Sequence, residues 1–158
     1  MITLFDPQNL EIFGQLLLAA ILGSLIGTER EIKGRLAGVK THALVCVGSC
    51  LFTILSTVGF GSFASAGGFN PAQVASQIVA GIGFIGAGLI IFHESKIQGL
   101  TTAAGIWTTA GIGMTIGLKF YFVAFFATFL VILIYTLLYY FELYLHRVWD
   151  KRDKDSQS

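Results

Sequence analysis

The sequence predicts an all-α integral membrane protein with five transmembrane helices, on the evidence of its composition and the placement of its charges. Of 158 residues, 54% are hydrophobic and only 12% are charged, too few polar side chains to cover a soluble globule of this size. No Asp, Glu, Lys or Arg occurs within residues 12–28, 41–93, 97–118 or 120–141. Because about 20 apolar residues cross the hydrocarbon layer, the 41–93 stretch has room for two spans and the others for one each.

The first predicted span begins at Asp6-Pro7, an N-cap residue followed by proline at the first helical position, and its apolar run lasts to about Gly27. Residues 1–8 contain no Lys or Arg, so we expect no cleavable signal peptide. Glu11 is expected to be solvated at the membrane interface, and Gly23 and Gly27 predict a close helix contact near the other end of the span.

A charged loop, predicted over residues 28–40, leads to a second span at about residues 41–60. One stripe of this span carries small polar side chains at helical spacing, which is typical of a face that packs on protein. Its members are His42, Cys46, Ser49, Thr53 and Ser56. A soft metal bound by His42, Cys46 and Cys50 is an alternative, although a closed site needs four such ligands and the chain has no third cysteine.

The third span, residues 74–92, is rich in glycine and is predicted to be the buried centre of the bundle. On a helical wheel Ile78, Ile82, Ile85 and Leu89 form one stripe, expected to face lipid. The other stripes are small enough for close helix contact, and the expected packing residues are Gln77, Gly81, Gly83, Gly86 and Gly88. The glycines also match the dinucleotide pattern GxGxxG, but they lie in mid-span and no acid follows about 20 residues later, which favours packing.

The last two spans differ in polarity. Residues 99–118 are rich in Thr and Gly, so this fourth span is expected inside the bundle, whereas the bulky residues of 120–141 place the fifth span at the periphery. We expect a membrane domain over residues 1–145 and a short basic, polar tail over residues 146–158.

Nine of the ten Lys and Arg residues fall on one side of this five-span arrangement, with Lys119 alone on the other. The positive-inside rule makes that side cytoplasmic, with the N-terminus outside and the C-terminus inside. Matches at an offset of 61, such as Gly27 with Gly88 and Thr41 with Thr102, are consistent with a parallel duplication of a two-helix hairpin.

Polar side chains converge on the predicted cytoplasmic mouth of the bundle and form the candidate site for a ligand or a partner. They are Glu29, Arg30, Glu31, Lys40, Thr41, His42, Glu94, Thr101 and Thr102. The helix N-termini beside Thr41 and Thr101, with Lys40, can hold an anion. Alternatively Glu29, Glu31 and Glu94 offer hard oxygen ligands to a hydrated magnesium ion, or the threonines only cap helices while the charges solvate a loop.

Four segments resemble the membrane domain of the MgtC/SapB family: residues 22–31, 37–45, 75–88 and 99–107, within a likeness over about residues 10–140. The resemblance implies a bacterial inner-membrane protein linked to magnesium limitation. It also implies a regulatory role on other membrane proteins such as the F-type ATP synthase. Lys40 stands where the family often has Arg, and the soluble C-terminal domain of virulence-type members is expected to be absent, because about a dozen polar residues follow the last span.

The sequence thus predicts a non-enzymatic modulator of magnesium and ion homeostasis, with a magnesium or other ion permease as the alternative. The expected partners are the bilayer, other membrane proteins and a second copy of the chain in a homodimer, and no nucleic acid. No cofactor is expected apart from the magnesium ion considered above. An enzyme is disfavoured because no nucleophile, base and orienting group fall together outside the mouth.

Overall fold

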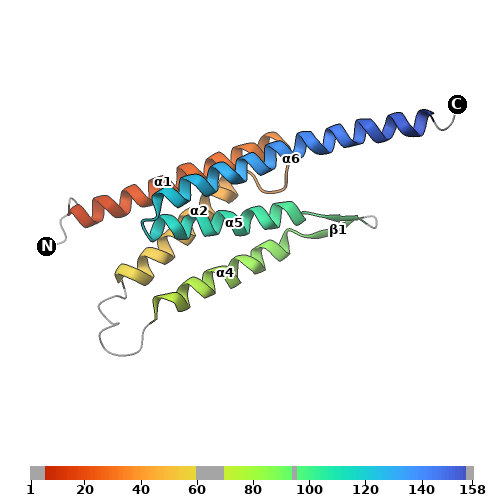
Figure 1. The fold of residues 1–158 in the computed structure, drawn as a ribbon. Helices are drawn as coiled ribbons and strands as arrows, with labels where there is room; N and C mark the ends of the chain where they lie inside the picture. Colours follow the sequence, from red (N-terminus) through yellow and green to blue (C-terminus); the bar gives the residue numbers. More distant parts are fainter. Residues whose placement is uncertain (1–5, 60–69, 94–95, 156–158) are drawn as a thin grey trace.

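A computed structural model of the chain describes residues 6–59, 70–93 and 96–155 (Figure 1). The predicted all-α class is confirmed. In chain order the elements are α1 (Pro7–Ile32), α2 (Val39–Ile54), the π-helical turn η1 (Leu55–Gly59) that continues α2, α4 (Pro71–Gly88), β1 (Ile91–His93), β2 (Lys96–Gln98), α5 (Leu100–Gly117) and α6 (Tyr121–Asp155). The two short strands pair antiparallel, with Phe92 opposite Ile97, where the sequence predicted only a polar connection.

Successive helices run in opposite directions, so α1, α4 and α6 point one way while α2 and α5 point the other (Figure 1). The α1–α2 connection and the β-hairpin lie at the same end of the bundle. Among the residues that the structure describes, three segments are long and apolar enough to cross a membrane: Pro7–Ile32, Val39–Gly59 and Tyr121–Phe141. Helices α4 and α5 have 18 residues each, or about 27 Å of helix. Their glycine, threonine and glutamine residues make these two helices less hydrophobic than the three segments above.

Several predicted boundaries shift. Helix α1 continues to Ile32 and α2 starts at Val39, so the predicted loop over residues 28–40 shrinks to residues 33–38. Helix α6 continues to Asp155, which puts the expected boundary between domain and tail inside a helix. The Asn70-Pro71 start of α4 is a capped one, because the Asn70 side chain accepts a hydrogen bond from the backbone N–H of Ala72.

The core lies between α1, α2 and α5, whose backbones approach each other at glycines. A Cβ on Gly23 or Gly27 would overlap the backbone of α2, and a Cβ on Gly113 or Gly117 would overlap α2 from the other side. Such contacts hold helices together in lipid, where burial of apolar side chains supplies little driving force. Across this core the Gln15 amide donates to the carbonyl oxygen of Ile116 at 2.7 Å.

Three sequence predictions about burial are confirmed. The whole polar stripe of α2, from His42 to Ser56, is buried. Helix α5 is the most enclosed, with Thr102, Thr109 and Ile116 among its buried residues. In the membrane-length part of α6 only 11% of residues are buried, as expected for a peripheral helix.

The prediction that the glycine-rich helix is the centre of the bundle is wrong for the single chain. In α4 only Ile82 and Gly86 are buried, and α2 and α5 occupy the centre instead. The helical wheel grouped the residues correctly but assigned the faces in reverse. Most of the isoleucine stripe expected in lipid turns inward, where Ile78 and Leu89 pack against the buried cluster that includes Ile82 and Ile106 of α5. Ile85 stays 46% exposed.

The predicted packing residues of α4 therefore have few neighbours within the chain. Gln77, Gly81, Gly83 and Gly88 are exposed, and a Cβ on any of these three glycines would meet nothing within 4 Å. Gly86 alone faces a helix, with Ala103 of α5 next to it. The expected hairpins are present as α1 packed on α2 and α4 packed on α5, while their origin by duplication stays a prediction.

Gly113→Ala is expected to lower the free energy of unfolding by about 1–3 kcal/mol, because the added Cβ would overlap the Cys46 carbonyl oxygen and separate α5 from α2. Gly111→Ala is the matched control on the same helix, where a Cβ meets nothing within 4 Å and helix propensity favours alanine. Unfolding of the purified variants in a denaturing detergent compares them. Equal stability of the two variants would contradict the close α2–α5 contact.

Candidate functional site

A cluster of buried charges lies at the end of α1, beside α6. It comprises Glu29, Arg30 and Lys33 of α1 with Tyr135 and Tyr139 of α6, and is called the charged cluster below. Arg30 is only 3% exposed, its Nη1 lies 3.6 Å from Glu29 Oε2, and its guanidinium carbon lies 4.0 Å from the centre of the Tyr135 ring. Stacking on an aromatic ring compensates a desolvated guanidinium for part of its lost hydration.

Lys33 completes the charged cluster from the next turn of α1. Its Nζ lies 2.6 Å from Glu29 Oε1, donates to the Tyr135 carbonyl oxygen at 3.1 Å, and lies 4.1 Å from the centre of the Tyr139 ring. Glu29 thus faces two cations, whose attraction offsets the cost of removing its carboxylate from water. The Arg30 Nε has no hydrogen-bond partner among the described residues.

A buried histidine adjoins the charged cluster. His42 of α2 is fully buried, and its Nδ1 lies 2.8 Å from the Thr109 hydroxyl of α5, which itself donates to the Gly105 carbonyl oxygen. Since that hydroxyl has only one proton, it accepts from Nδ1–H, and His42 Nε2 is left as an acceptor. No described residue donates to Nε2.

Tyr135 connects the two parts of the site. A Cβ on Gly105 would overlap the Tyr135 hydroxyl and would lie 3.6 Å from the His42 ring. The hydroxyl therefore occupies the space that the glycine leaves open on α5, next to the imidazole. Four helices contribute to one polar centre: α1 the charges, α2 the histidine, α5 Thr109 and Gly105, and α6 the tyrosines.

The tight connection between α1 and α2 positions these groups. Glu31 Oε2 accepts a hydrogen bond from the backbone N–H of Val39 at 2.8 Å, and so caps the start of α2. A Cβ on Gly38 would overlap the Glu31 carboxylate, and a Cβ on Gly27 would overlap Val39. These close approaches set the start of α2 against α1 and place His42 beside the core.

The structure brings only some of the predicted site residues together. Glu29, Arg30 and His42 belong to the polar centre, and Thr102 is buried nearby on α5. Glu31 is a helix cap, Thr41 is half-buried, Lys40 and Thr101 are exposed, and Glu94 lies outside the described residues. Sequence reasoning missed Lys33, Thr109 and Tyr135, although Lys33 follows Glu29 at the i,i+4 spacing of helical ion pairs.

The sequence raised two metal hypotheses, a soft-metal site at His42, Cys46 and Cys50 and a magnesium site at Glu29, Glu31 and Glu94. In the parts of the chain that the structure describes, no three His, Cys, Asp or Glu side chains lie together. Cys46 and Cys50 are buried free thiols in the apolar core, and His42 Nδ1 is bonded to Thr109. Glu29 and Glu31 have separate partners, and the magnesium site that includes Glu94 stays a prediction.

A second ion pair lies near the other end of α1. Lys119 Nζ, in the turn between α5 and α6, donates to Glu11 Oε2 at 2.7 Å, and this hydrogen bond raises the pKa of Lys119. Both side chains are about half exposed, and Glu11 has a partner that the sequence did not reveal. Its solvation at the membrane interface stays a prediction. An exposed pair of this kind orients two elements and contributes little stability.

Comparison with known proteins decides the family, because residues 16–144 match the MgtC family. The chain belongs to the MgtC family. The family resemblance that the sequence motifs predicted is thereby confirmed. No solved structure matches this MgtC-family chain.

Three relatives illustrate the similarity. The chain is 41% identical over 153 residues to an uncharacterized protein of Haemophilus influenzae, covering 94% of this chain and 64% of that protein. It is 50% identical over 109 residues to "Putative magnesium transporter YhiD" of Escherichia coli K12, covering 68% and 51%. It is 46% identical over 103 residues to Protein MgtC of Salmonella typhimurium LT2, covering 65% and 42%. The chain therefore spans less than two thirds of each relative.

Arg30→Met should lower the free energy of unfolding of this MgtC-family chain by about 3 kcal/mol, because it removes one of the two cations beside a buried carboxylate and the partner of the Tyr135 ring. Arg35→Met, an exposed arginine in the following connection, should change stability by less than about 0.5 kcal/mol. Detergent unfolding of both variants measures the difference. Equal effects would mean that the buried position of Arg30 contributes nothing.

Gly105→Ala should cost about 1–3 kcal/mol, because its Cβ would overlap the Tyr135 hydroxyl. Tyr135→Phe removes that oxygen, so the double variant should recover much of the loss, with a coupling energy of roughly 1 kcal/mol in a double-mutant cycle. Simple addition of the two single losses would show that Tyr135 does not reach Gly105.

Proposed function

We propose that this chain is a non-enzymatic protein of the bacterial cytoplasmic (inner) membrane that modulates other membrane proteins during magnesium limitation. Family membership and the names of two relatives support the link to magnesium. The regulatory role, with the F-type ATP synthase as one target, is what the family resemblance implies.

In this proposal the chain crosses the bilayer five times, with the N-terminus outside and the C-terminus in the cytoplasm. The alternating helix directions and the three long apolar segments support that topology. So does the distribution of Lys and Arg, nine of which fall with the α1–α2 connection, the β-hairpin and the end of α6. The polar centre then lies near the cytoplasmic surface, where a soluble signal or a partner's cytoplasmic loop has access.

The observation that favours a modulator is that several core threonines already donate their hydroxyl protons within their own helices. Thr53 donates to the Ser49 carbonyl oxygen, Thr109 to that of Gly105 and Thr128 to that of Ala124, each at 2.8 Å. Between them the core is filled by residues such as Ile26, Ile106 and Ile116, all fully buried. A permease needs a file of available oxygen ligands along its axis, and the described core does not supply one.

A magnesium or other ion permease is the second candidate. The name of the Escherichia coli relative favours it, and so do the two buried nitrogens of Arg30 and His42 that have no partner among the described residues. In a permease these two groups would line the ion pathway instead of forming a regulatory contact.

Purified chain in liposomes is expected to show no saturable magnesium flux above protein-free liposomes, because its core lacks a path of available ligands. A fluorescent magnesium indicator inside the vesicles measures the flux. Robust saturable transport would reject the modulator and establish the permease.

The same proposal requires the polar centre in cells. Glu29→Gln should lower stability, as Arg30→Met does, and should impair growth in low magnesium even when expression is adjusted to the wild-type protein level, because it uncouples Glu29 from Arg30 and Lys33. Thr101→Ala, an exposed position outside the charged cluster, is the control and should support growth. Full growth with Glu29→Gln would remove the centre from the function.

A further inference from the structure

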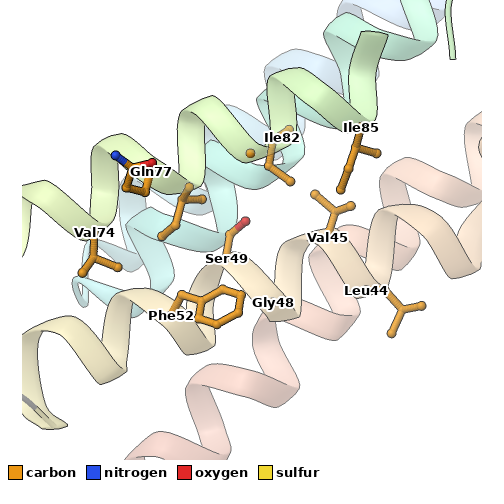
Figure 2. Close-up of a pocket in the computed structure, with 11 residues that line it drawn as sticks. Leu44, Val45, Gly48, Ser49, Phe52, Val74, Gln77, Ile82 and Ile85 are labelled. Atoms are coloured by element: carbon orange, nitrogen blue, oxygen red, sulfur yellow. The ribbon is translucent and has the colours of Figure 1, made fainter. Parts of the chain in front are cut away.

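A groove of about 570 Å³ lies between α2 and α4 (Figure 2). Its walls are apolar for most of their area, with Phe52 of α2 and Ile82 of α4 among the lining residues. Gly48 of α2 and Gly81 of α4 line opposite walls, and a Cβ on either glycine would meet nothing within 4 Å. Both helix backbones are thus open to close approach from outside the chain.

Two polar groups line this apolar groove and lack partners. Ser49 is only 3% exposed, its side chain points from α2 into the space between the helices (Figure 2), and its hydroxyl makes no hydrogen bond to any described residue. The Gln77 amide on the α4 wall likewise has no hydrogen bond within the described parts of the chain. Gln77 is the seventh residue of α4, about 9 Å along the helix, and so lies at hydrocarbon depth if α4 spans the bilayer.

These groups discriminate between lipid and protein as the occupant. An acyl chain fills apolar space but cannot bond a hydroxyl or an amide, and unsatisfied polar groups are costly in hydrocarbon. A helix with a polar side chain satisfies both groups, and the two bare glycines permit it to come close. The groove therefore suits a helix that carries its own donor and acceptor.

We propose that the groove receives α4 of a second copy of this chain, and that the groove of the second copy receives α4 of the first. Helix α4 has the required properties: beyond the groove its exposed face carries small residues at Ala80, Gly83 and Ala87, with Phe84, 84% exposed, as a bulky apolar side chain among them to fill the partner's apolar groove. A glutamine amide both donates and accepts, so Gln77 can bond Ser49 of the partner subunit or the partner's Gln77. One patch then supplies the groove and the inserted helix, as a two-fold interface requires.

This dimer explains the exposed position of the glycine-rich helix. Apart from Gly86, the small residues that the sequence placed in a packing core find no partner among the described residues of one chain, and the second copy supplies it. The inference rests on the proposed five-span topology, in which α4 crosses the bilayer, but not on the ion or the target protein, so the regulatory role can fail while the dimer stands.

The test measures self-association of the full chain in liposomes, by energy transfer between fluorescent proteins fused to its C-terminus, over a series of protein-to-lipid ratios. A saturable dimer is expected. Gln77→Leu should raise its dissociation constant by about 3- to 30-fold, the range for interhelical hydrogen bonds in membranes. Gly81→Leu should raise it about 10-fold or more, because the added side chain fills the groove.

Matched controls separate the groove from general effects. Gly14→Leu on α1 also adds bulk where a Cβ meets nothing within 4 Å, but outside the groove, and should leave the dimer unchanged. Gln77→Cys should form a disulfide between copies on oxidation, while Phe13→Cys, exposed on α1, should not. The proposal is overturned if the chain is a monomer at every protein-to-lipid ratio, with or without bound lipid. It is also overturned if Gln77→Leu and Gly81→Leu leave the dissociation constant of the dimer unchanged.

Discussion

The close approach of α2 to its two neighbours is the constraint on which the rest of the structure depends. In lipid, helices gain little by burying apolar side chains against each other, so van der Waals contact between backbones and a few hydrogen bonds must hold them. Gly23 and Gly27 allow this contact on the α1 side, and Gly113 and Gly117 allow it on the α5 side. The polar stripe of α2 is enclosed as a consequence, because two backbones press on it.

The polar centre follows from the same packing. His42 reaches Thr109 because α2 and α5 are in contact, and Tyr135 reaches Gly105 because that residue has no side chain. For Arg30 and Glu29, the Tyr135 ring, Lys33 and the contact between the two side chains compensate for part of the lost hydration. The centre combines paired charges with an imidazole nitrogen that has no partner among the described residues.

Helix α4 has a different relation to the bundle. It contacts α5 through isoleucines and Gly86, and leaves most of its small residues outside. Chains that expose unsatisfied amides and bare glycines at hydrocarbon depth gain by associating, because the bilayer offers no substitute partner. The loosely packed side of the molecule is the surface that we propose for assembly, while the tightly packed side contains the polar centre.

The amino-acid sequence by itself determined the helical class, the family, the buried polar stripe of α2, the enclosed α5 and the peripheral α6. Each of these follows from properties local to one helix: its hydropathy, its side-chain size and its periodicity. Only the tertiary structure decided which face of α4 turns inward, because a helical wheel states which residues share a face and not what that face meets. It also decided that Lys33 meets Tyr135 and that Glu11 meets Lys119, pairs more than 100 residues apart along the chain. Such contacts depend on how helices dock, and docking is set by the summed fit of many side chains rather than by any one motif.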